Sequence, residues 1–225
     1  MSAKGRGKIP DSEALAADKA RAFKPFRVSR ETETRLDRLV EVLFLWQPRI
    51  NLVSSSTLNS VWSRHVVDSL QLLPLAPPAA KVFVDLGSGA GFPALPLACA
   101  LAERPGAHVH LVESNGKKAA FLREAIRQAN LPATVHAERI EDFAKNFSGP
   151  IDVVTARALA PLPQLLEFAA PLLKPGVIGL FPKGQDVGAE LTEASRYWTI
   201  RYELAPSKTD PAGQIVIVRE LKRAA

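Results

Sequence analysis

The sequence of 225 residues predicts an α/β fold, built on a mostly parallel β-sheet with helices on both faces. Two observations lead to this fold class. From residue 81 onward, short apolar runs alternate with segments of helical periodicity, which is the pattern of a parallel sheet covered by helices. Near the C-terminus, two apolar runs follow each other with only a Pro- and Gly-containing linker between them, which predicts an antiparallel hairpin.

The N-terminal part of the chain predicts a tail followed by helices. We expect residues 1–28 to be a flexible basic tail with one short helix near Ser12–Ala22, because they lack apolar periodicity and are rich in Lys, Arg, Ala and Gly. Residues 29–76 are expected to form a helical cap. Its first helix ends before Pro48, and its second helix is expected over residues 57–73.

Residues 77–225 are expected to form the α/β core. Seven apolar runs are the strand candidates, namely Val82–Leu86, His108–Glu113, Thr134–Ala137, Ile151–Ala156, Val177–Phe181, Thr199–Leu204 and Gln214–Leu221. Helices are expected between the first six of them, at Phe92–Glu103, Asn115–Asn130, Glu141–Phe147, Pro161–Leu172 and Gln185–Tyr197. The last two strands have no helix between them, so they are expected to pair as the hairpin.

The net charge of +6 is unevenly distributed along the chain. The first 30 residues hold eight Lys and Arg against three Asp and Glu, so they carry +5, and the other 195 residues carry +1. Such a balance indicates a polyanionic partner. The basic character lies mostly in the tail, so any recognition of a polyanion by the core needs a local patch of positive charge.

The composition also excludes several classes of protein. The only cysteine, Cys99, excludes internal disulfides and a multi-cysteine metal site, and the four histidines show no metal-ligand spacing. No apolar run is long enough to span a bilayer, and the N-terminus lacks the apolar segment of a secretory signal. We therefore expect a soluble cytoplasmic protein without a bound metal ion.

The strongest local signal is the glycine-rich segment Val84–Pro93, which follows the first strand of the core and opens a helix. Gly87, Gly89 and Gly91 permit positive φ angles and a close approach of a ligand to the backbone. Open α/β sheets bind ligands at the carboxyl ends of their strands. The segment therefore predicts a nucleotide-type site, with a tight turn of purely structural role as the alternative.

The spacing of the glycines favours one class of ligand. No Gly-Lys-Ser/Thr follows, which excludes a Walker phosphate loop, and the pattern differs from the dinucleotide fingerprint. With Asp85 inside the strand, the segment instead resembles motif I of class I S-adenosylmethionine-dependent methyltransferases. In that class an acid at the end of the second strand accepts hydrogen bonds from the ribose hydroxyls, and Glu113 stands at that place. A Glu113 side chain that merely faces water is the alternative.

Further strings of residues occur in an order and spacing that narrow the resemblance. They are Asn51-Leu52, Arg64–Leu70, Gly87–Pro93, Glu113–Lys118 with Phe121-Leu122, Arg139–Glu141, Ala156–Ala158 and Lys183-Gly184. Over about residues 40–185, the chain resembles the small-subunit (16S) ribosomal RNA guanine-N(7) methyltransferases, also called glucose-inhibited division protein B. One departure is Ala94, where the family usually has glycine, and the first 30 residues have no recognised counterpart.

This resemblance implies a fold, an activity and a cofactor. The fold is that of a class I methyltransferase, Rossmann-like, with a seven-stranded sheet and an N-terminal helical extension, so that residues 29–225 form the methyltransferase domain. The activity is methyl transfer from S-adenosylmethionine to the N(7) ring nitrogen of a guanine, with 16S ribosomal RNA or the small ribosomal subunit as the partner. The cofactor-binding residues expected from the loop and the family positions are Asp85, Gly87, Ser88, Gly89, Gly91, Phe92, Glu113, Ile140, Glu141 and Arg157.

The chemistry of the acceptor agrees with this resemblance. N(7) of guanine carries an available lone pair, so methyl transfer needs the positioning of donor and acceptor and no general base. Methylators of exocyclic amines usually carry an Asn/Asp-Pro-Pro-aromatic string after the fourth strand, where this chain has Thr155–Ala160. Carbon-5 pyrimidine methylators need a nucleophilic cysteine, whereas Cys99 lies in the middle of an apolar helix.

Arg157 and Lys183 are the candidate catalytic residues. Arg157 follows the fourth strand and is expected to position the cofactor carboxylate or the target base, with a structural ion pair as the alternative. Lys183 ends the fifth strand and is expected to contact a phosphate or the base, with a solvated lysine as the alternative. On the cap, Arg64, His65 and Asp68 lie at helical spacing, where they either gate the cleft or make only local hydrogen bonds.

Two other functions stay open at this point. One is an RNA- or ribosome-binding assembly factor without turnover, which the intact glycines and Glu113 argue against; the other is a small-molecule methyltransferase, which would bind RNA negligibly. Lys117, Lys118, Arg123 and Arg127 lie near the expected rim, where they either contact RNA or form a solvated helix face. We expect the protein to be a monomer.

Overall fold

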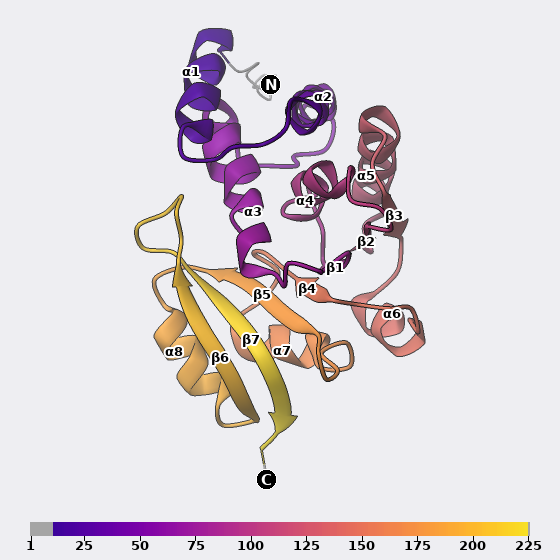
Figure 1. Ribbon diagram of the computed structural model, residues 1–225, viewed down its shortest axis with the longest axis vertical. Helices are drawn as coiled ribbons and strands as arrows, with labels where there is room; N and C mark the ends of the chain where they lie inside the picture. The colour runs from indigo at the N-terminus through magenta and orange to yellow at the C-terminus, as the bar shows by residue number, and fades with distance from the viewer. Residues whose placement is uncertain (1–10, 225) are drawn as a thin grey trace, which may run out of the picture.

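Residues 11–224 are described by the structure, a computed structural model (Figure 1). A seven-stranded sheet runs through the molecule in the order β3-β2-β1-β4-β5-β7-β6. The strands are β1 (Val82–Leu86), β2 (His108–Val112), β3 (Ala133–His136), β4 (Val153–Thr155), β5 (Ile178–Lys183), β6 (Trp198–Pro206) and β7 (Gln214–Arg223). All seven strand candidates are therefore present, with ends that differ by a few residues.

The direction of the strands confirms the predicted fold class. Strands β1 to β5 pair in parallel, whereas β7 pairs antiparallel with both β5 and β6. The strand order reverses at β1, which has β2 on one side and β4 on the other. In open α/β sheets the crevice at such a reversal is where ligands bind, so the glycine-rich segment after β1 lies at the expected place.

Helices cover both faces of the sheet (Figure 1). Apolar residues of α2, α4 and α5 form one core cluster with the cap, and those of α6, α7 and α8 form the other. Strand β1 serves both clusters, because Phe83 packs in the first and its neighbour Val84 in the second. These helices are α2 (Arg30–Trp46), α4 (Ala94–Leu101), α5 (Gly116–Ala129), α6 (Ile140–Asn146), α7 (Leu162–Ala169) and α8 (Val187–Ala194).

Residues 1–28 were expected to be a flexible basic tail with one short helix near Ser12–Ala22, and the structure has a helix at that place. Residues 1–10 lie outside the described part of the chain, but α1 (Ser12–Phe23) is a helix that packs against the cap. The buried carboxylate of Asp18 anchors it. Asp18 Oδ2 accepts hydrogen bonds from the backbone N–H groups of Trp62 and Ser63 at 3.0 and 3.1 Å. A count of charges does not predict this role, because it treats Asp18 only as one of the three acidic residues in a basic segment.

The second cap helix, expected over residues 57–73, is instead a succession of short segments. They are the 3₁₀ turn η1 (Ser55–Ser60), the π-helical turn η2 (Trp62–Val67), α3 (Asp68–Leu70) and the 3₁₀ turn η3 (Leu73–Leu75). Asp18 caps the start of η2, where N–H groups have no partner within their own helix. Single π-helical turns are frequent at functional sites, and η2 carries His65.

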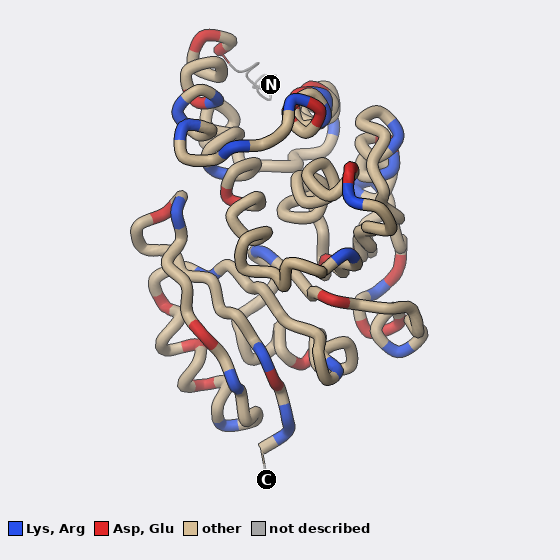
Figure 2. Tube along the Cα trace, viewed as in Figure 1, with Lys and Arg blue, Asp and Glu red and all other residues tan. Residues whose placement is uncertain are grey.

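Charged residues of both signs occur along the helices and the C-terminal strands (Figure 2). Many form exposed ion pairs, such as that of Arg223 with Glu167 at 2.6 Å. An exposed pair contributes about 1 kcal/mol or less to stability, so the two apolar clusters hold the fold together. None of the helices within residues 11–224 is long and apolar enough to cross a membrane.

Candidate functional site

The glycine-rich loop joins β1 to α4 at the crevice of the sheet. Gly87 and Gly91 have φ angles of +64° and +83°, which a side chain disfavours. Space requires glycine as well, because a Cβ on Gly87 would lie 2.5 Å from Leu159 Cδ1 and one on Gly91 would lie 2.3 Å from Leu95 Cδ1. The loop therefore packs closely against both α4 and the segment that follows β4.

Glu113, directly after β2, holds the loop from the other side. The residue is 8% exposed, and its Oε2 accepts a hydrogen bond from the N–H of Gly89 at 2.8 Å. Oε1 accepts one from the N–H of Asn115 at 2.7 Å. A carboxylate has about four acceptor positions, so Glu113 retains capacity for ligand hydroxyls. The alternative of a carboxylate that merely faces water is wrong, since the side chain is buried and bonded.

A cavity of about 550 Å³ lies beside the loop, a volume typical of small-molecule sites. Most of the predicted cofactor-binding residues line it, namely Gly87, Ser88, Gly89, Phe92, Glu113, Ile140, Glu141 and Arg157. Sequence reasoning missed apolar lining residues such as Leu52 and Val53 on the cap and Phe168 at the end of α7. In the sequence these positions look like ordinary core residues, so only the folded chain reveals that they border a cavity.

Asp85 and Gly91 are not among the residues that line this cavity, and contact of either with the cofactor stays a prediction. Asp85 is 1% exposed, and its Oδ1 accepts a hydrogen bond from the Thr155 hydroxyl at 2.7 Å. Oδ2 has no hydrogen-bond partner among the described residues. Burial raises the pKa of Asp85 from 3.8 to about 6. Asp85 also holds the loop through its backbone carbonyl, which accepts a hydrogen bond from the Ser88 hydroxyl at 3.1 Å.

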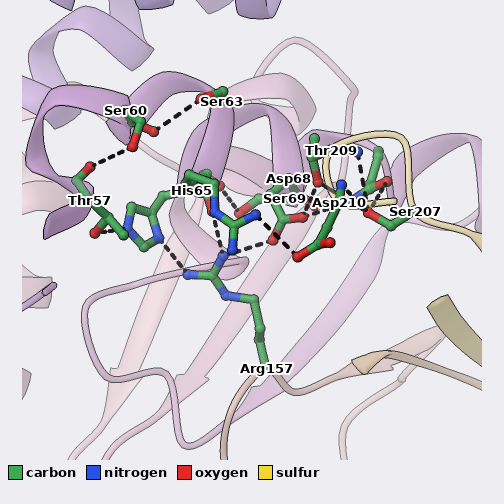
Figure 3. Close-up of polar contacts among 12 residues, drawn as sticks. Thr57, Ser60, Ser63, His65, Asp68, Ser69, Arg157, Ser207, Thr209 and Asp210 are labelled. Atoms are coloured by element: carbon green, nitrogen blue, oxygen red, sulfur yellow. Dashed lines mark hydrogen bonds and ion pairs between the residues drawn. The ribbon is translucent and has the colours of Figure 1, made fainter. Parts of the chain in front are cut away.

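Arg157 lies at the centre of a polar network between the cap and the sheet (Figure 3). Its Nη1 donates to Asp68 Oδ2 at 2.8 Å and to the carbonyl of Arg64 at 3.1 Å. Its Nη2 lies 2.9 Å from Nδ1 of His65. The ion pair with Asp68 is therefore present, and Asp68 reaches well beyond its own helix. A guanidinium has five N–H donors, so Arg157 keeps two for a ligand in the cavity that it lines.

The hydrogen bonds of His65 define its tautomer. The Thr57 hydroxyl donates to the Ser54 carbonyl at 2.9 Å, so its oxygen accepts from the N–H at Nε2 of His65, 2.9 Å away. Nδ1 then carries the lone pair that accepts from Arg157. Burial, followed by the charges of Arg157 and Arg64, lowers the pKa of His65 from 6.5 to about 3. His65 is thus a neutral acceptor that holds the guanidinium of Arg157. Its ring stacks on that of Phe92, with the ring centroids 5.0 Å apart.

The same network ties the cap to the loop between β6 and β7. Asp68 Oδ1 accepts hydrogen bonds from Gln71 and Thr209, and Arg64 forms an ion pair with Asp210 at 3.1 Å (Figure 3). Arg64 and Asp210 are 146 residues apart along the chain, and Asp68 and Thr209 are 141 apart. No local sequence pattern predicts these contacts, so the sequence analysis did not identify the contribution of the β6–β7 loop.

A second cavity of about 420 Å³ adjoins the first, and His65, Arg157 and Ala158 line both. Lys183 lines the second cavity and not the first. Its side chain is 10% exposed, and its Nζ lies 2.6 Å from Oε2 of Glu190. The alternative of a solvated lysine is therefore wrong. Glu190 was missed, because one glutamate in an amphipathic helix resembles any solvated residue.

The remaining candidates are placed less centrally. Of the cations on α5, Lys118 lines the first cavity, whereas Arg127 is exposed and pairs with Glu124. The ring nitrogens of His110 and His136 lie 3.0 Å apart on β2 and β3. Within residues 11–224, however, no group of three or more His, Cys, Asp and Glu side chains is arranged to hold a metal ion.

The residues of the first cavity fit S-adenosylmethionine. Glu113 would supply carboxylate oxygens for the ribose hydroxyls, and Arg157 would supply its spare guanidinium donors for the methionine carboxylate. Phe92, Ile140 and Phe168 would supply apolar walls for the adenine base of the cofactor. The volume of the cavity lies within the range of ligand sites. The donor set and the walls thus match the charged and apolar ends of the molecule.

The fold and this loop define a class I S-adenosylmethionine-dependent methyltransferase. Solved structures of that fold are similar over most of the chain. An O-methyltransferase from Bacillus cereus in complex with SAH has a TM-score of 0.56, with 16% identity over 92% of this chain and 98% of its own. Aeropyrum pernix fibrillarin with bound S-adenosyl-L-methionine has a TM-score of 0.51, with 13% identity over 67% of this chain and 72% of its own.

The chain belongs to the rRNA small subunit methyltransferase G family, whose family model matches residues 32–210. A ribosomal RNA small subunit methyltransferase G from Bradyrhizobium sp. (strain BTAi1) is 58% identical over 212 residues, which cover 94% of this chain and 95% of the relative. One from Nitrobacter hamburgensis is 53% identical over 97% of this chain and 84% of its own length. The family resemblance noted in the sequence is confirmed, and the chain is a methyltransferase with S-adenosylmethionine as its cofactor.

Proposed function

We propose that this methyltransferase transfers the methyl group of S-adenosylmethionine to N(7) of a guanine in 16S ribosomal RNA. The observation that carries the proposal is the pair of adjoining cavities, which share His65, Arg157 and Ala158. A nucleoside-type cavity beside a second one of similar volume suits a donor and an acceptor base that must meet. A relative of 58% identity that is named for the methylation of small-subunit rRNA supports an RNA acceptor.

In this mechanism the protein positions the two reactants. When bound, S-adenosylmethionine supplies an electrophilic methyl group on a sulfonium. Glu113 and the loop Gly87–Gly91 hold the nucleoside part in the first cavity, with Ile140 and Glu141 at its edge. Arg157, fixed by Asp68 and His65, orients the methionine carboxylate or the base, and Lys183 contacts the base from the second cavity. Correct placement of two reactants is itself a large part of such a rate enhancement.

The absence of a proton transfer at the acceptor agrees with the ionisation of the groups at the site. N(7) of guanine attacks through its lone pair, so no side chain has to remove a proton. The low pKa of His65, about 3, keeps its ring neutral near pH 7, and its lone pair at Nδ1 is committed to Arg157. We also propose that the enzyme acts as a monomer in the cytoplasm.

The test is methyl transfer from labelled S-adenosylmethionine to 16S RNA and to assembled small subunits, followed by mapping of the modified base. Chemical cleavage at N(7)-methylguanine should reveal one nucleotide. Glu113→Ala should weaken cofactor affinity more than 10-fold and reduce transfer accordingly, because it removes the proposed ribose acceptor. Transfer to neither RNA nor subunit would contradict the proposal. Cofactor-independent RNA binding would then favour an assembly factor, and negligible RNA binding a small-molecule methyltransferase.

A further inference from the structure

The ion pair of Lys183 and Glu190 lies in the second cavity. In the proposed mechanism Lys183 contacts the acceptor base, and Glu190 has no role. Lys183 ends β5, and Glu190 lies on α8. Their side chains are 10% and 24% exposed, so the pair is largely removed from water. Such a pair gives little net stability, because the desolvation of two charges offsets their attraction. The atoms of the pair that stay without a hydrogen-bond partner therefore determine what the pair can recognise.

Lys183 has one N–H donor to spare, and Glu190 has one oxygen to spare, which carries two lone pairs. The ammonium of Lys183 has three N–H donors, and two are used, for Glu190 Oε2 at 2.6 Å and for the Ala160 carbonyl at 3.0 Å. Oε2 of Glu190 also accepts from the N–H of Leu162. Oε1 of Glu190 has no hydrogen-bond partner within the described residues. The pair thus offers one donor beside one acceptor, and both residues line the second cavity.

The other carboxylates of this cavity are already engaged on both oxygens. Asp68 accepts from Arg157 on Oδ2 and from Gln71 on Oδ1. Asp210 accepts from Arg64 on Oδ2 and from the backbone N–H of Ala212 on Oδ1. Glu190 is therefore the carboxylate of this cavity with an oxygen left over, as judged from residues 11–224.

We propose that the Lys183–Glu190 pair selects guanine as the acceptor base, with Lys183 Nζ donating to O6 and Glu190 accepting from N1–H and the 2-amino group. The inference rests on the proposed function. When N(7) faces the donor in the first cavity, N1–H and the 2-amino group point away from it, toward the second cavity. A donor beside an acceptor matches guanine, whereas adenine presents an amine to the ammonium and a lone pair to the carboxylate.

The experiment compares guanine with inosine, which keeps N(7), O6 and N1–H and lacks only the 2-amino group. The RNA is 16S RNA with either base at the mapped nucleotide, made by joining a synthetic oligonucleotide to the flanking RNA. Wild type and Glu190→Gln are compared by kcat/KM for labelled methyl transfer. Glutamine still accepts from Leu162 and Lys183 through its one amide oxygen, so the variant preserves the local packing. Its NH2 group then replaces Oε1, so the acceptor for the 2-amino group is lost.

For wild type, we expect kcat/KM to be about 10- to 100-fold lower with inosine than with guanine at the mapped nucleotide. For Glu190→Gln, we expect the decrease to be less than about 5-fold. The affinity of both proteins for S-adenosylhomocysteine should be equal, which shows an intact first cavity. Glu193→Gln, the same exchange on the exposed side of α8, should keep the wild-type discrimination. The double variant Lys183→Met with Glu190→Met, which removes donor and acceptor together, should show no discrimination.

Equal inosine costs in wild type and Glu190→Gln would overturn the inference and would mean that the pair only fastens α8 to β5 and α7. Absence of an inosine effect in wild type would overturn it too. Neither result touches the proposed function, because guanine would still be methylated. If wild type methylated no guanine in 16S RNA or in the subunit, the proposed function would fail and this inference with it.

Discussion

At the scale of single residues, the burial of Asp85 makes its ionised carboxylate unfavourable for the stability of the fold. Burial raises its pKa from 3.8 to about 6. A group with a raised pKa in the folded state contributes stability that is full below about pH 4 and lost as the pH rises to about 6. This rise of the pKa from 3.8 to about 6 corresponds to about 3 kcal/mol in the free energy of unfolding.

Asp85→Asn should therefore become more stable relative to wild type as the pH rises from 4 to 6, by up to about 3 kcal/mol, with no further change at higher pH. The asparagine Oδ1 can still accept from Thr155. Urea unfolding at several pH values measures this difference. Asp142→Asn, on the exposed surface of α6, is the control and should show no such trend. A difference that stays constant between pH 4 and 6 would contradict the assignment.

His65 gives a pH dependence of the opposite sign. Its pKa falls from 6.5 to about 3, chiefly through burial. A histidine with a lowered pKa stabilises the fold above pH 6.5, and this stability is lost as the pH falls toward 3. Nitrogen-15 NMR of the labelled imidazole should show the Nε2–H tautomer at pH 7 and no protonation down to pH 5. Protonation near pH 6.5 would mean that Arg157 is not held by a neutral ring.

At the scale of elements, the glycine loop was predicted well because its requirement is local. Positive φ at Gly87 and Gly91 follows from residue type and position between strand and helix, both legible in the sequence. The second cap helix was predicted poorly for the converse reason. Its break at η2 depends on Asp18, which comes from another helix 44 residues earlier. Periodicity reports which face is apolar, and it does not report a cap from elsewhere.

The loop gives a direct test of this local requirement. Gly91→Ala should destabilise the protein by about 2 to 5 kcal/mol, because φ is +83° and the new methyl group would lie 2.3 Å from Leu95 Cδ1. Gly188→Ala is the matched control. No atom lies within 4 Å of a Cβ there, so this exchange within α8 should stabilise the protein by about 0.5 to 1 kcal/mol. Thermal unfolding compares the two variants; a similar effect of both would show that the loop adapts.

At the scale of the whole molecule, the sequence predicted the position of the site in the fold. It did not predict the remote segments that also contribute residues to the site. The residues at the ends of β1, β2 and β4 were foreseen, because parallel strands place their carboxyl ends at one edge. The partners of Arg157 on the cap, the β6–β7 loop and Glu190 were not foreseen as a unit. These contacts join segments remote in sequence, and their side chains have no distinctive spacing.

The charge of the tail sets the last expectation, which concerns RNA binding by the full chain. Residues 2–10 hold Lys4, Arg6 and Lys8 and no acid. Each cation that neutralises a phosphate steepens the fall of affinity with salt by about 0.7 to 0.9 in a plot of log K against log salt. Replacing all three with glutamine should therefore flatten that slope by about 2 to 3, and should weaken RNA binding most at low salt.

This triple replacement is a cleaner test than deletion of residues 2–28. Such a deletion would also remove Asp18, leaving the N–H groups of Trp62 and Ser63 without their acceptor and lowering the free energy of unfolding. The triple variant should keep wild-type cofactor affinity and thermal stability, since it retains α1 with its Asp18 anchor. An unchanged salt slope would mean that the basic residues of the tail are incidental. RNA affinity would then have to come from cations at the rim of the cavities, such as Lys118.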